Sequence, residues 1–282
     1  MIKIDGKKVA ADLRAELKKK VAELKSTYNA APGLTVILVG EDAPSKIYVR
    51  NKEKFANEVG IKSEVVRYPD TIEEKTILNK IEELNKNSNV SGILVQLPLP
   101  IHIDKRKIIE AILPDKDVDG LHPMNVGNLS SGYDSMVPCT PLGCYLLIKD
   151  VEKDLNGKHA VVIGRSNLNG KPMTQLLLKE NCTVTITHSK TKDLKAECKR
   201  ADIIVAAVGR PKLVKADWVK KDAIVIDVGI NKTDTGLVGD VDFDEVSKVA
   251  KAVTPVPGGV GPMTIACLLS NTVECFKKVR SN

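Results

Sequence analysis

Residues 159–178 read HAVVIGRSNLNGKPMTQLLL. We expect the apolar run AVVI to form a buried strand, the segment from Gly164 to Gly170 a turn, and PMTQLLL a helix. Strand, glycine turn and helix in this order are typical of dinucleotide-binding folds, in which helix N-terminal amides face a phosphate. The glycines do not have the usual G-x-G-x-x-G spacing, so an ordinary strand-to-helix turn explains the pattern equally well.

The end of the following strand bears on which nucleotide would bind. Folds that bind NAD usually carry an acidic residue there, which accepts a hydrogen bond from the ribose. Here the predicted strand 183–187 runs into His188, Ser189 and Lys190, with no acid. A hydroxyl and cations near Arg165 suit the 2′-phosphate of NADP, because such groups form charge-assisted hydrogen bonds to phosphate oxygens. The alternative is that these side chains only cover a solvated loop.

On both sides of this stretch, short apolar runs alternate with amphipathic segments. This alternation predicts βαβ units and mainly parallel sheets, arranged as two α/β domains with a cleft between them. Strands are expected at 34–39, 63–67, 92–96, 159–163, 183–187, 203–207, 223–228 and 252–255. Helices are expected at 8–28, 44–59, 72–84, 108–113, 141–151 and 263–279. The turn-rich stretch 114–141 is a plausible domain junction.

Composition excludes several classes of protein. The 282 residues carry 43 Lys and Arg against 36 Asp and Glu, and the charges are interleaved, which favours a mixed surface over nucleic-acid binding. No apolar run reaches the ~20 residues of a membrane span. The six cysteines lack metal-ligand spacing and the four histidines are scattered, so no metal is expected. The N-terminus resembles no export signal, which predicts a cytoplasmic protein with reduced thiols.

Three polar residues in the predicted helix 44–59 are candidates for a reactive site. Tyr48 and Lys52 are four residues apart and share a helix face, and Ser45 lies one turn earlier. The alternative is a surface lysine whose stem packs on a tyrosine ring. Short-chain dehydrogenases use the same Tyr-x-x-x-Lys spacing, but their glycine turn precedes the pair. Here Gly164 follows it, which argues against that class.

Further polar residues follow the predicted strand 92–96. Gln96 ends this strand, and ligands of open α/β sheets gather at the carboxyl ends of strands. Asp117 and Asp119 then offer two carboxylates, although a plain aspartate turn explains them as well. The segment 255–262, PVPGGVGP, precedes the last helix and is compatible with a rigid linker.

Together these segments resemble the bifunctional methylenetetrahydrofolate dehydrogenase/methenyltetrahydrofolate cyclohydrolase family. The similar stretches occur in the family's order: SKIYVRNKEK (45–54), GILVQLPLP (92–100), PDKDVDGLHPMNVG (114–127), PCTPLG (138–143), GRSNLNGKPM (164–173), THSKT (187–191) and TPVPGGVGPMT (254–264). The resemblance implies a folate-binding catalytic domain of residues 1–137 with the C-terminal helix 263–282. Residues 138–262 would form a Rossmann-like NADP-binding domain.

The resemblance also implies an activity and its residues. The expected reactions are oxidation of 5,10-methylenetetrahydrofolate by NADP and hydrolysis of the methenyl product to 10-formyltetrahydrofolate, in one-carbon metabolism and purine biosynthesis. A cytoplasmic homodimer is expected, without nucleic acid or membrane partners. The implied catalytic residues are Lys52, which transfers a proton, Gln96, which tunes it, Tyr48 and Asp119. The implied folate contacts are Tyr48, Ser45, Asp119, Gly261 and Pro262, and the implied NADP contacts are Gly164, Arg165, Ser166, Ser189 and Ile230.

One departure and two other readings remain at this point. Leu168 and Asn169 stand where the family usually has an Ile-Val pair. A different two-domain NADP oxidoreductase, similar to shikimate dehydrogenases, would also carry Gly164 and Arg165. Such an enzyme would not need the segments KDVDG and PVPGGVGPMT. A non-enzymatic nucleic-acid-binding module would instead show strongly salt-dependent DNA binding without NADP binding.

Overall fold

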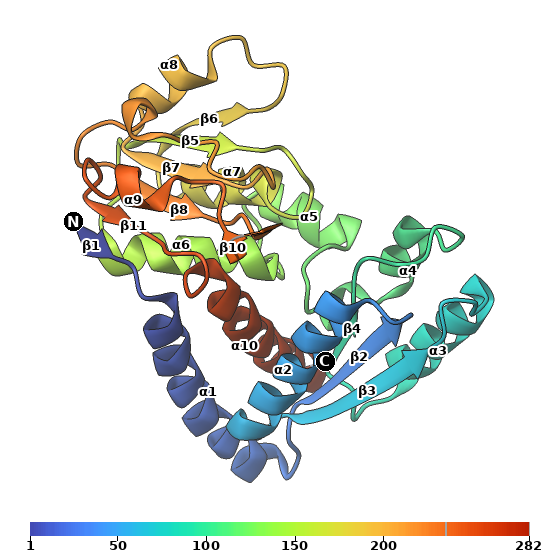
Figure 1. Ribbon diagram of the computed structural model, residues 1–282. Helices are drawn as coiled ribbons and strands as arrows, with labels where there is room; N and C mark the ends of the chain where they lie inside the picture. Colours follow the sequence, from blue (N-terminus) through green and yellow to red (C-terminus); the bar gives the residue numbers. More distant parts are fainter. Residues whose placement is uncertain (235, 282) are drawn as a thin grey trace. The chain divides into compact units, whose positions relative to one another are not determined.

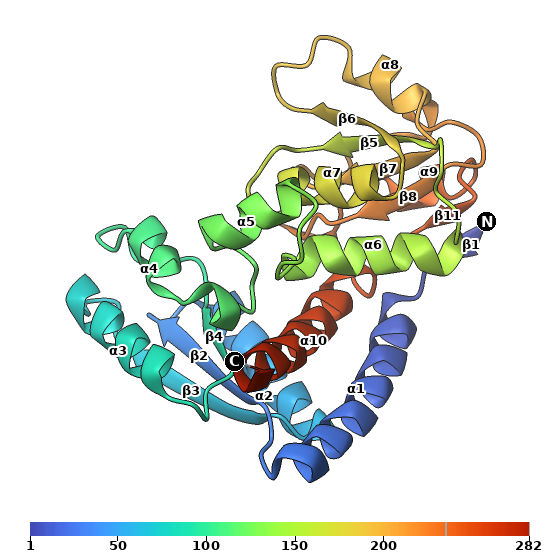
Figure 2. The same ribbon diagram turned by 180° about the vertical axis from the view of Figure 1, so that it is seen from behind.

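The computed structural model describes residues 1–234 and 236–281. They form two compact units, each with a parallel β-sheet and flanking helices (Figures 1 and 2). Residues 1–10 and 140–264 make up the six-stranded unit, and residues 11–139 and 265–281 make up the three-stranded unit. The predicted organisation as two α/β domains is confirmed.

The six-stranded unit has a wholly parallel sheet with the strand order β1-β11-β8-β7-β5-β6. Its strands are β1 (Ile2–Lys3), β5 (His159–Ile163), β6 (Thr183–Thr187), β7 (Ile203–Ala206), β8 (Ile224–Asp227) and β11 (Ala252–Val253). The inner strands β7 and β8 are buried along their whole length. That burial explains why they appear in the sequence as continuous apolar runs instead of alternating patterns.

Helices cover both faces of this sheet (Figures 1 and 2). They are α6 (Cys139–Val151), α7 (Gly170–Lys179), α8 (Leu194–Lys199) and α9 (Phe243–Val246), with the short 3₁₀ turn η2 (Ala216–Trp218). Val161 and Ile163 of β5 belong to the core cluster that includes Cys198 and Val246. The alternate residue Val162 points to the opposite face, where α7 packs beside β5.

Two small features of this unit lie outside the expected elements. The two-residue strand β1 pairs with β11, Ile2 opposite Ala252, so the first ten residues belong to this unit. The expected division had placed them in residues 1–137. Strands β9 (Asn231–Thr233) and β10 (Gly236–Val238) form an antiparallel pair. Strands this short carry too few side chains to show a period in the sequence.

The three-stranded unit has the strand order β3-β2-β4, again all parallel. Its strands are β2 (Gly33–Val39), β3 (Lys62–Tyr68) and β4 (Gly92–Val95). Its helices are α2 (Ala43–Val59), α3 (Glu74–Lys86), α4 (Lys105–Ala111) and α5 (Pro123–Ser130), with the 3₁₀ turn η1 (Pro114–Lys116). Two long helices, α1 (Gly6–Tyr28) and α10 (Val260–Ser281), cross the division between the units.

Opposite faces of this smaller sheet carry different helices (Figure 1). Ile37 of β2 and Ile93 of β4 pack with Ile77 and Ile81 of α3. The alternate residue Val36 points to the other face, where α2 lies beside β2 and β3. The turn-rich stretch 114–141 holds η1, α5 and the start of α6, and the periodicity of the sequence showed neither η1 nor α5.

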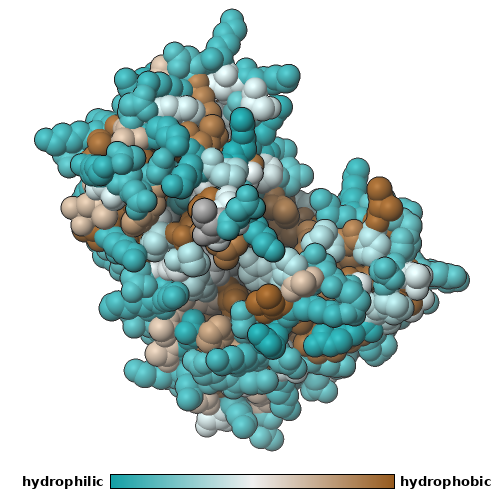
Figure 3. All heavy atoms as spheres, in the orientation of Figure 1, coloured by the Kyte–Doolittle hydropathy of each residue, from teal (hydrophilic) through white to brown (hydrophobic). Residues whose placement is uncertain are grey.

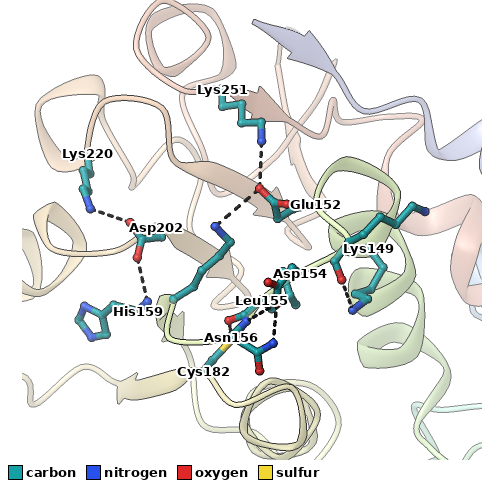
Figure 4. Close-up of polar contacts among 12 residues, drawn as sticks. Lys149, Glu152, Asp154, Leu155, Asn156, His159, Cys182, Asp202, Lys220 and Lys251 are labelled. Carbon is teal, nitrogen blue, oxygen red and sulfur yellow. Dashed lines mark hydrogen bonds and ion pairs between the residues drawn. The ribbon is translucent and has the colours of Figure 1, made fainter.

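Charged residues of the six-stranded unit pair with one another at the amino ends of its strands (Figure 4). The Asp202 carboxylate accepts hydrogen bonds from the His159 backbone N–H (2.9 Å) and from Lys220 Nζ (2.6 Å). Glu152 lies 3.1 Å from Lys251 Nζ. These contacts tie loops together at the edge away from the carboxyl ends of the strands, so we assign them to structure.

Polar side chains cover most of the face shown in Figure 3, with apolar residues in small patches. Within residues 1–234 and 236–281, no helix combines the length and the apolar character that crossing a membrane requires.

Candidate active site and nucleotide site

Lys52 occupies a core position of α2. The buried residues of this helix are Ser45, Val49, Lys52, Ala56 and Val59, spaced three or four apart as on the inner face of any amphipathic helix. The Lys52 side chain is buried among them, with an exposed fraction of 8% for the residue. Because a lysine in such a position loses hydration that an apolar residue would not need, its presence points to a chemical role.

The Lys52 amine has one defined partner, Gln96. Lys52 Nζ donates to Gln96 Oε1 over 2.9 Å. The other end of the amide is held as well, because Gln96 Nε2 donates to the Leu97 carbonyl over 2.7 Å. Gln96 itself directly follows β4, and its backbone N–H donates to Ile37 O of the neighbouring strand. The hydrogen bond to the Leu97 carbonyl therefore orients the Gln96 amide so that its oxygen, and not its nitrogen, faces the lysine.

Asp119 adds a carboxylate to this pair. Burial lowers the pKa of Lys52 from its ordinary value, while the charges of Asp119 and Cys139 act in the opposite direction. Burial likewise raises the pKa of Asp119, and the Lys52 charge lowers it. Burial is the largest contribution for both groups, and it favours their neutral forms. Burial and the Asp119 charge also raise the pKa of the Cys139 thiol, which therefore stays protonated.

The residues before Asp119 explain how it is held. Lys116 Nζ donates to the backbone carbonyls of Leu84, Asn85 and Asn87, at 2.9, 2.8 and 2.8 Å, and so closes the C-terminal end of α3. Asp117 is buried beside β4, to which it forms a parallel bridge at Ile93. The segment PDKDVDG is thus anchored by Lys116 and Asp117, while Asp119 interacts with Lys52 and Cys139.

Three further residues, which the sequence patterns did not single out as site residues, complete this anchor. The Asp117 carboxylate accepts hydrogen bonds from the His122 backbone N–H (2.8 Å) and from Asn125 Nδ2 (2.9 Å) of α5. Asn271 Nδ2 of α10 donates to the carbonyls of Val118 and Val137, both over 2.9 Å. Asn271 lies far along the chain from Val118, so sequence proximity gave no signal for this contact.

We expect Lys116→Met to lower the free energy of unfolding by about 3 kcal/mol, because one buried and two partly buried carbonyl contacts lose a charged donor. Lys107→Met is the matched control, since Lys107 makes an exposed ion pair with Glu74, and we expect it to change stability by less than about 1 kcal/mol. Chemical denaturation of the two variants measures the difference. Equal stabilities would show that Lys116 adds nothing to the anchor.

The other two candidates on α2 lie differently. Tyr48 is partly exposed, with 37% of its surface accessible, so its ring is available to a ligand. Ser45 is buried in the first turn, and its hydroxyl donates to Asp42 Oδ2 over 2.6 Å. Asp42 also accepts from the Ser45 backbone N–H over 2.9 Å and thereby caps the helix. The Ser45 proton is thus used within the helix cap, and its oxygen lone pairs remain for other contacts.

The glycine turn after β5 is too tight for side chains at two positions. A Cβ atom on Gly170 would lie 2.0 Å from Gly164 O, and one on Gly164 would lie 2.4 Å from Ala207 O. Gly164 also has φ of +118°, which L side chains rarely adopt. Next to the turn is a narrow gap, without room for a water molecule, whose lining includes Asn169, Gly170, Ala207 and Val228. Such a close backbone approach at the start of a helix fits a dinucleotide phosphate.

The remaining nucleotide candidates follow the carboxyl ends of three strands of the same sheet. Arg165 and Ser166 follow β5, Ser189 follows β6 and Ile230 follows β8, and all four are exposed. Ser166 Oγ accepts the backbone N–H of Asn169 over 3.1 Å, which tightens the turn. The Asn169 side chain makes no cap hydrogen bond to α7, but the Lys171 backbone N–H donates to the Ser166 carbonyl over 3.1 Å. The residues present therefore fit NADP.

Gly261 and Pro262 lie in the first turn of α10, and both are partly exposed. A Cβ atom on Gly261 would meet no other atom within 4 Å, so packing within the chain does not require glycine there. Among the described residues, no group of three or more histidine, cysteine or acidic side chains is placed to hold a metal ion.

Comparison with known proteins gives an extensive match. A family model described as the tetrahydrofolate dehydrogenase/cyclohydrolase catalytic domain matches residues 4–119. The model for the NAD(P)-binding domain of the same family matches residues 138–280. A bifunctional protein FolD from Pelagibacter ubique is 78% identical over 278 residues, which is 99% of both chains.

Solved structures agree with these matches. The bifunctional FolD dehydrogenase/cyclohydrolase of Campylobacter jejuni is 50% identical with a TM-score of 0.96, covering 99% of each chain. The Trypanosoma brucei enzyme, solved with NADP and an inhibitor, is 39% identical with a TM-score of 0.95, covering 100% of this chain and 99% of that one. The Aquifex aeolicus shikimate dehydrogenase, 13% identical with a TM-score of 0.52, shares the fold alone. The chain belongs to the tetrahydrofolate dehydrogenase/cyclohydrolase family.

Proposed function

We propose that this protein oxidises 5,10-methylenetetrahydrofolate with NADP and hydrolyses the resulting methenyl compound to 10-formyltetrahydrofolate. The observation that carries the proposal is the buried Lys52 amine, which lies 2.9 Å from Gln96 Oε1 and interacts electrostatically with Asp119. The family match and the glycine turn at Gly164 and Gly170 support the dehydrogenase half. NADP supplies the hydride acceptor when it is bound.

The hydrolytic step follows from the state of the lysine. Burial lowers the pKa of Lys52, so a larger fraction of its amine is neutral near pH 7 than for an exposed lysine. A neutral amine can take a proton from the water whose oxygen bonds to the methenyl carbon. The hydroxyl of the adduct then loses its remaining proton as the formyl carbonyl forms, the bond from that carbon to N5 breaks, and the lysine returns its proton to N5. The formyl group stays on N10, and one proton is released overall. The positive charge of the methenyl substrate further disfavours a charged lysine.

The other residues bind and orient the reactants. We assign Asp119 to the amine and amide edge of the pterin, and the exposed Tyr48 ring to packing on the folate. Ser45, Gly261 and Pro262 are proposed as further folate contacts. Hydride transfer needs no protein acid, because the nitrogens of the folate stabilise the product cation. For that step the chain needs only to align folate and nicotinamide.

A coupled assay tests the proposal. Purified protein is given 5,10-methylenetetrahydrofolate with either NADP or NAD, and the absorbance of the methenyl intermediate is followed as it forms and decays. Formation and decay with NADP are expected. A protein that forms no methenyl compound with either cofactor does not perform the proposed oxidation, and one in which that compound decays no faster than in buffer is no cyclohydrolase.

We propose that Arg165 and Ser189 hold the 2′-phosphate of NADP, with Gly164, Ser166 and Ile230 along the rest of the cofactor. Arg165→Ser is expected to raise KM for NADP about tenfold and to leave KM for NAD nearly unchanged, because only NADP carries that phosphate. Arg200→Ser is the matched control, since Arg200 pairs with Glu197 on α8. An equal rise of KM for both cofactors would argue against a phosphate contact.

The assembly and location of the protein are proposed from the same resemblance. We propose a cytoplasmic homodimer without nucleic-acid partners. The interleaving of basic and acidic residues along the sequence supports the last point. Size-exclusion chromatography with light scattering distinguishes monomer from dimer, and a DNA titration at low salt tests for nucleic-acid binding.

A further inference from the structure

Asp240 is a fully buried carboxylate in the six-stranded unit, with 0% of its surface accessible. Its Oδ2 atom accepts the backbone N–H groups of Val208 (2.7 Å) and Gly209 (2.9 Å). Its Oδ1 atom accepts the backbone N–H of Arg210 (2.8 Å) and Nδ2 of Asn231 (2.9 Å). A carboxylate offers about four acceptor positions, so these four donors saturate it.

The two segments that Asp240 joins lie at the edge of the sheet where ligands bind. Residues 208–210 follow β7, and Asn231 comes four residues after the end of β8. These strands are parallel neighbours, with Ala206 opposite Asp227, so their carboxyl ends meet at one edge. Ala207 and Val228, which immediately follow the two strands, both line the narrow gap beside the glycine turn. The bonds of Asp240 therefore fix backbone that directly follows the two strand ends beside the glycine turn.

A second buried carboxylate holds Asp240 in turn. Asp227 Oδ1 accepts the backbone N–H of Asp240 over 2.8 Å, and Oδ2 accepts that of Val241 over 2.9 Å. Each of these two carboxylates lies against a glycine that no other residue could replace. A Cβ atom on Gly239 would lie 1.8 Å from Asp227 Oδ2, and one on Gly229 would lie 2.2 Å from Asp240 Oδ1. This close fit joins the strand end, the turn at 239–241 and the loop at 208–210.

The bonding also restricts which part of the cofactor this loop can touch. Three successive backbone N–H groups, at 208, 209 and 210, already bind the Asp240 carboxylate, so they cannot bind a phosphate. In the sheet order, β6 with Ser189 and β5 with the glycine turn lie together, and β7 and β8 follow. A dinucleotide with its 2′-phosphate at β6 and its pyrophosphate at β5 must extend its nicotinamide half toward β7 and β8.

We propose that Asp240 is a positioning residue for the nicotinamide half of NADP, acting by fixing residues 208–210 against the segment of Ile230 and Asn231. This inference rests on the proposed function, since it presumes that the six-stranded unit binds NADP. It assigns Asp240 no contact with the cofactor. Its effect passes through the loop backbone. Loss of the Asp240 carboxylate should therefore weaken binding of the nicotinamide half of the cofactor and leave binding of the adenosine half nearly unchanged.

The test compares binding of NADP and of adenosine 2′,5′-bisphosphate, which lacks the nicotinamide half. Asp240→Asn replaces one acceptor oxygen by an NH₂ group that faces two N–H donors. By calorimetric titration we expect Kd for NADP to rise about tenfold or more, and Kd for the bisphosphate to change by less than about twofold. Hydrogen exchange in the free protein should become faster at the amides of Val208, Gly209 and Arg210.

Two other variants serve as controls. Asp242→Asn makes the same chemical change two residues away, at a carboxylate that pairs with Lys215 (2.9 Å), and should alter neither affinity nor exchange. Asn231→Ala removes one of the four donors and should weaken NADP binding in the same direction, by a smaller factor. It replaces Asp240→Asn as the test if that variant does not fold, which loss of bisphosphate binding would reveal.

The outcomes separate this inference from the function on which it rests. If the unaltered protein does not bind NADP, the proposed function fails. If it binds NADP but Asp240→Asn or Asn231→Ala binds it equally well, the positioning role of Asp240 is refuted while the function stands. Equal weakening of NADP and bisphosphate binding in a folded variant would also refute it, because the effect would then not be confined to the nicotinamide half.

Discussion

Replacing Lys52 by methionine is expected to lower the cyclohydrolase rate about 1,000-fold, while oxidation of 5,10-methylenetetrahydrofolate by NADP continues. Methionine is about as long as the lysine stem and suits the apolar stripe of α2, so the helix should keep its packing. What is lost is the amine that accepts the proton of the attacking water. Stopped-flow measurement of both steps, each from its own substrate, gives the two rates separately.

Lys54→Met is the matched control for this experiment. Lys54 lies on the same helix, two residues on, but it is exposed, and its amine lies 5.6 Å from the centre of the Phe55 ring. Both rates should stay near those of the unaltered protein in this control. Cyclohydrolase turnover that survives in Lys52→Met would remove the lysine from the mechanism. Loss of both activities together, in a variant that still binds NADP, would show that Lys52 also serves the hydride step.

The hydrophobic pattern predicted the main strands and helices because the longer helices show a period and the buried strands form continuous apolar runs. Strand β2 and helix α2 differ from their expected bounds by one residue at the start. The expected helix 108–113 forms earlier, as Lys105–Ala111, because Asp104 caps it by accepting the Arg106 backbone N–H. The two-residue strand β1 had no such signal, since its pairing with β11 is a contact between the two ends of the chain.

The candidate site was predictable only in part. The helix spacing placed Tyr48 and Lys52 near each other, and the strand end placed Gln96 at a ligand edge. The spacing could not show that Lys52 is buried while Tyr48 is partly exposed, because that depends on how α2 packs against the sheet. Asp240 followed no recognisable motif. Its four donors lie 9 to 32 residues away along the chain and meet only after the sheet has formed.

Replacing Gln96 by glutamate should move the pH dependence of the cyclohydrolase reaction. Lys52 Nζ lies 2.9 Å from Gln96 Oε1, so the variant would place a negative charge next to the amine. A charge of opposite sign at this distance stabilises the ammonium form and raises the pKa of Lys52, by about 1–3 pH units in comparable cases. Since the proton acceptor is the neutral amine, the pH at which the cyclohydrolase activity rises should move upward in this variant.

At pH 7 we therefore expect the cyclohydrolase rate of Gln96→Glu to fall roughly 100-fold, with recovery as the pH is raised. The dehydrogenase rate should fall much less, because that step uses no base on the protein. Gln96→Ala is the control: it removes the hydrogen bond without adding charge, so its rate should fall without an upward shift of the profile. A pH-independent loss in Gln96→Glu would mean that the glutamine acts by geometry alone. In that case the neutral amine of Lys52 would not be the limiting species.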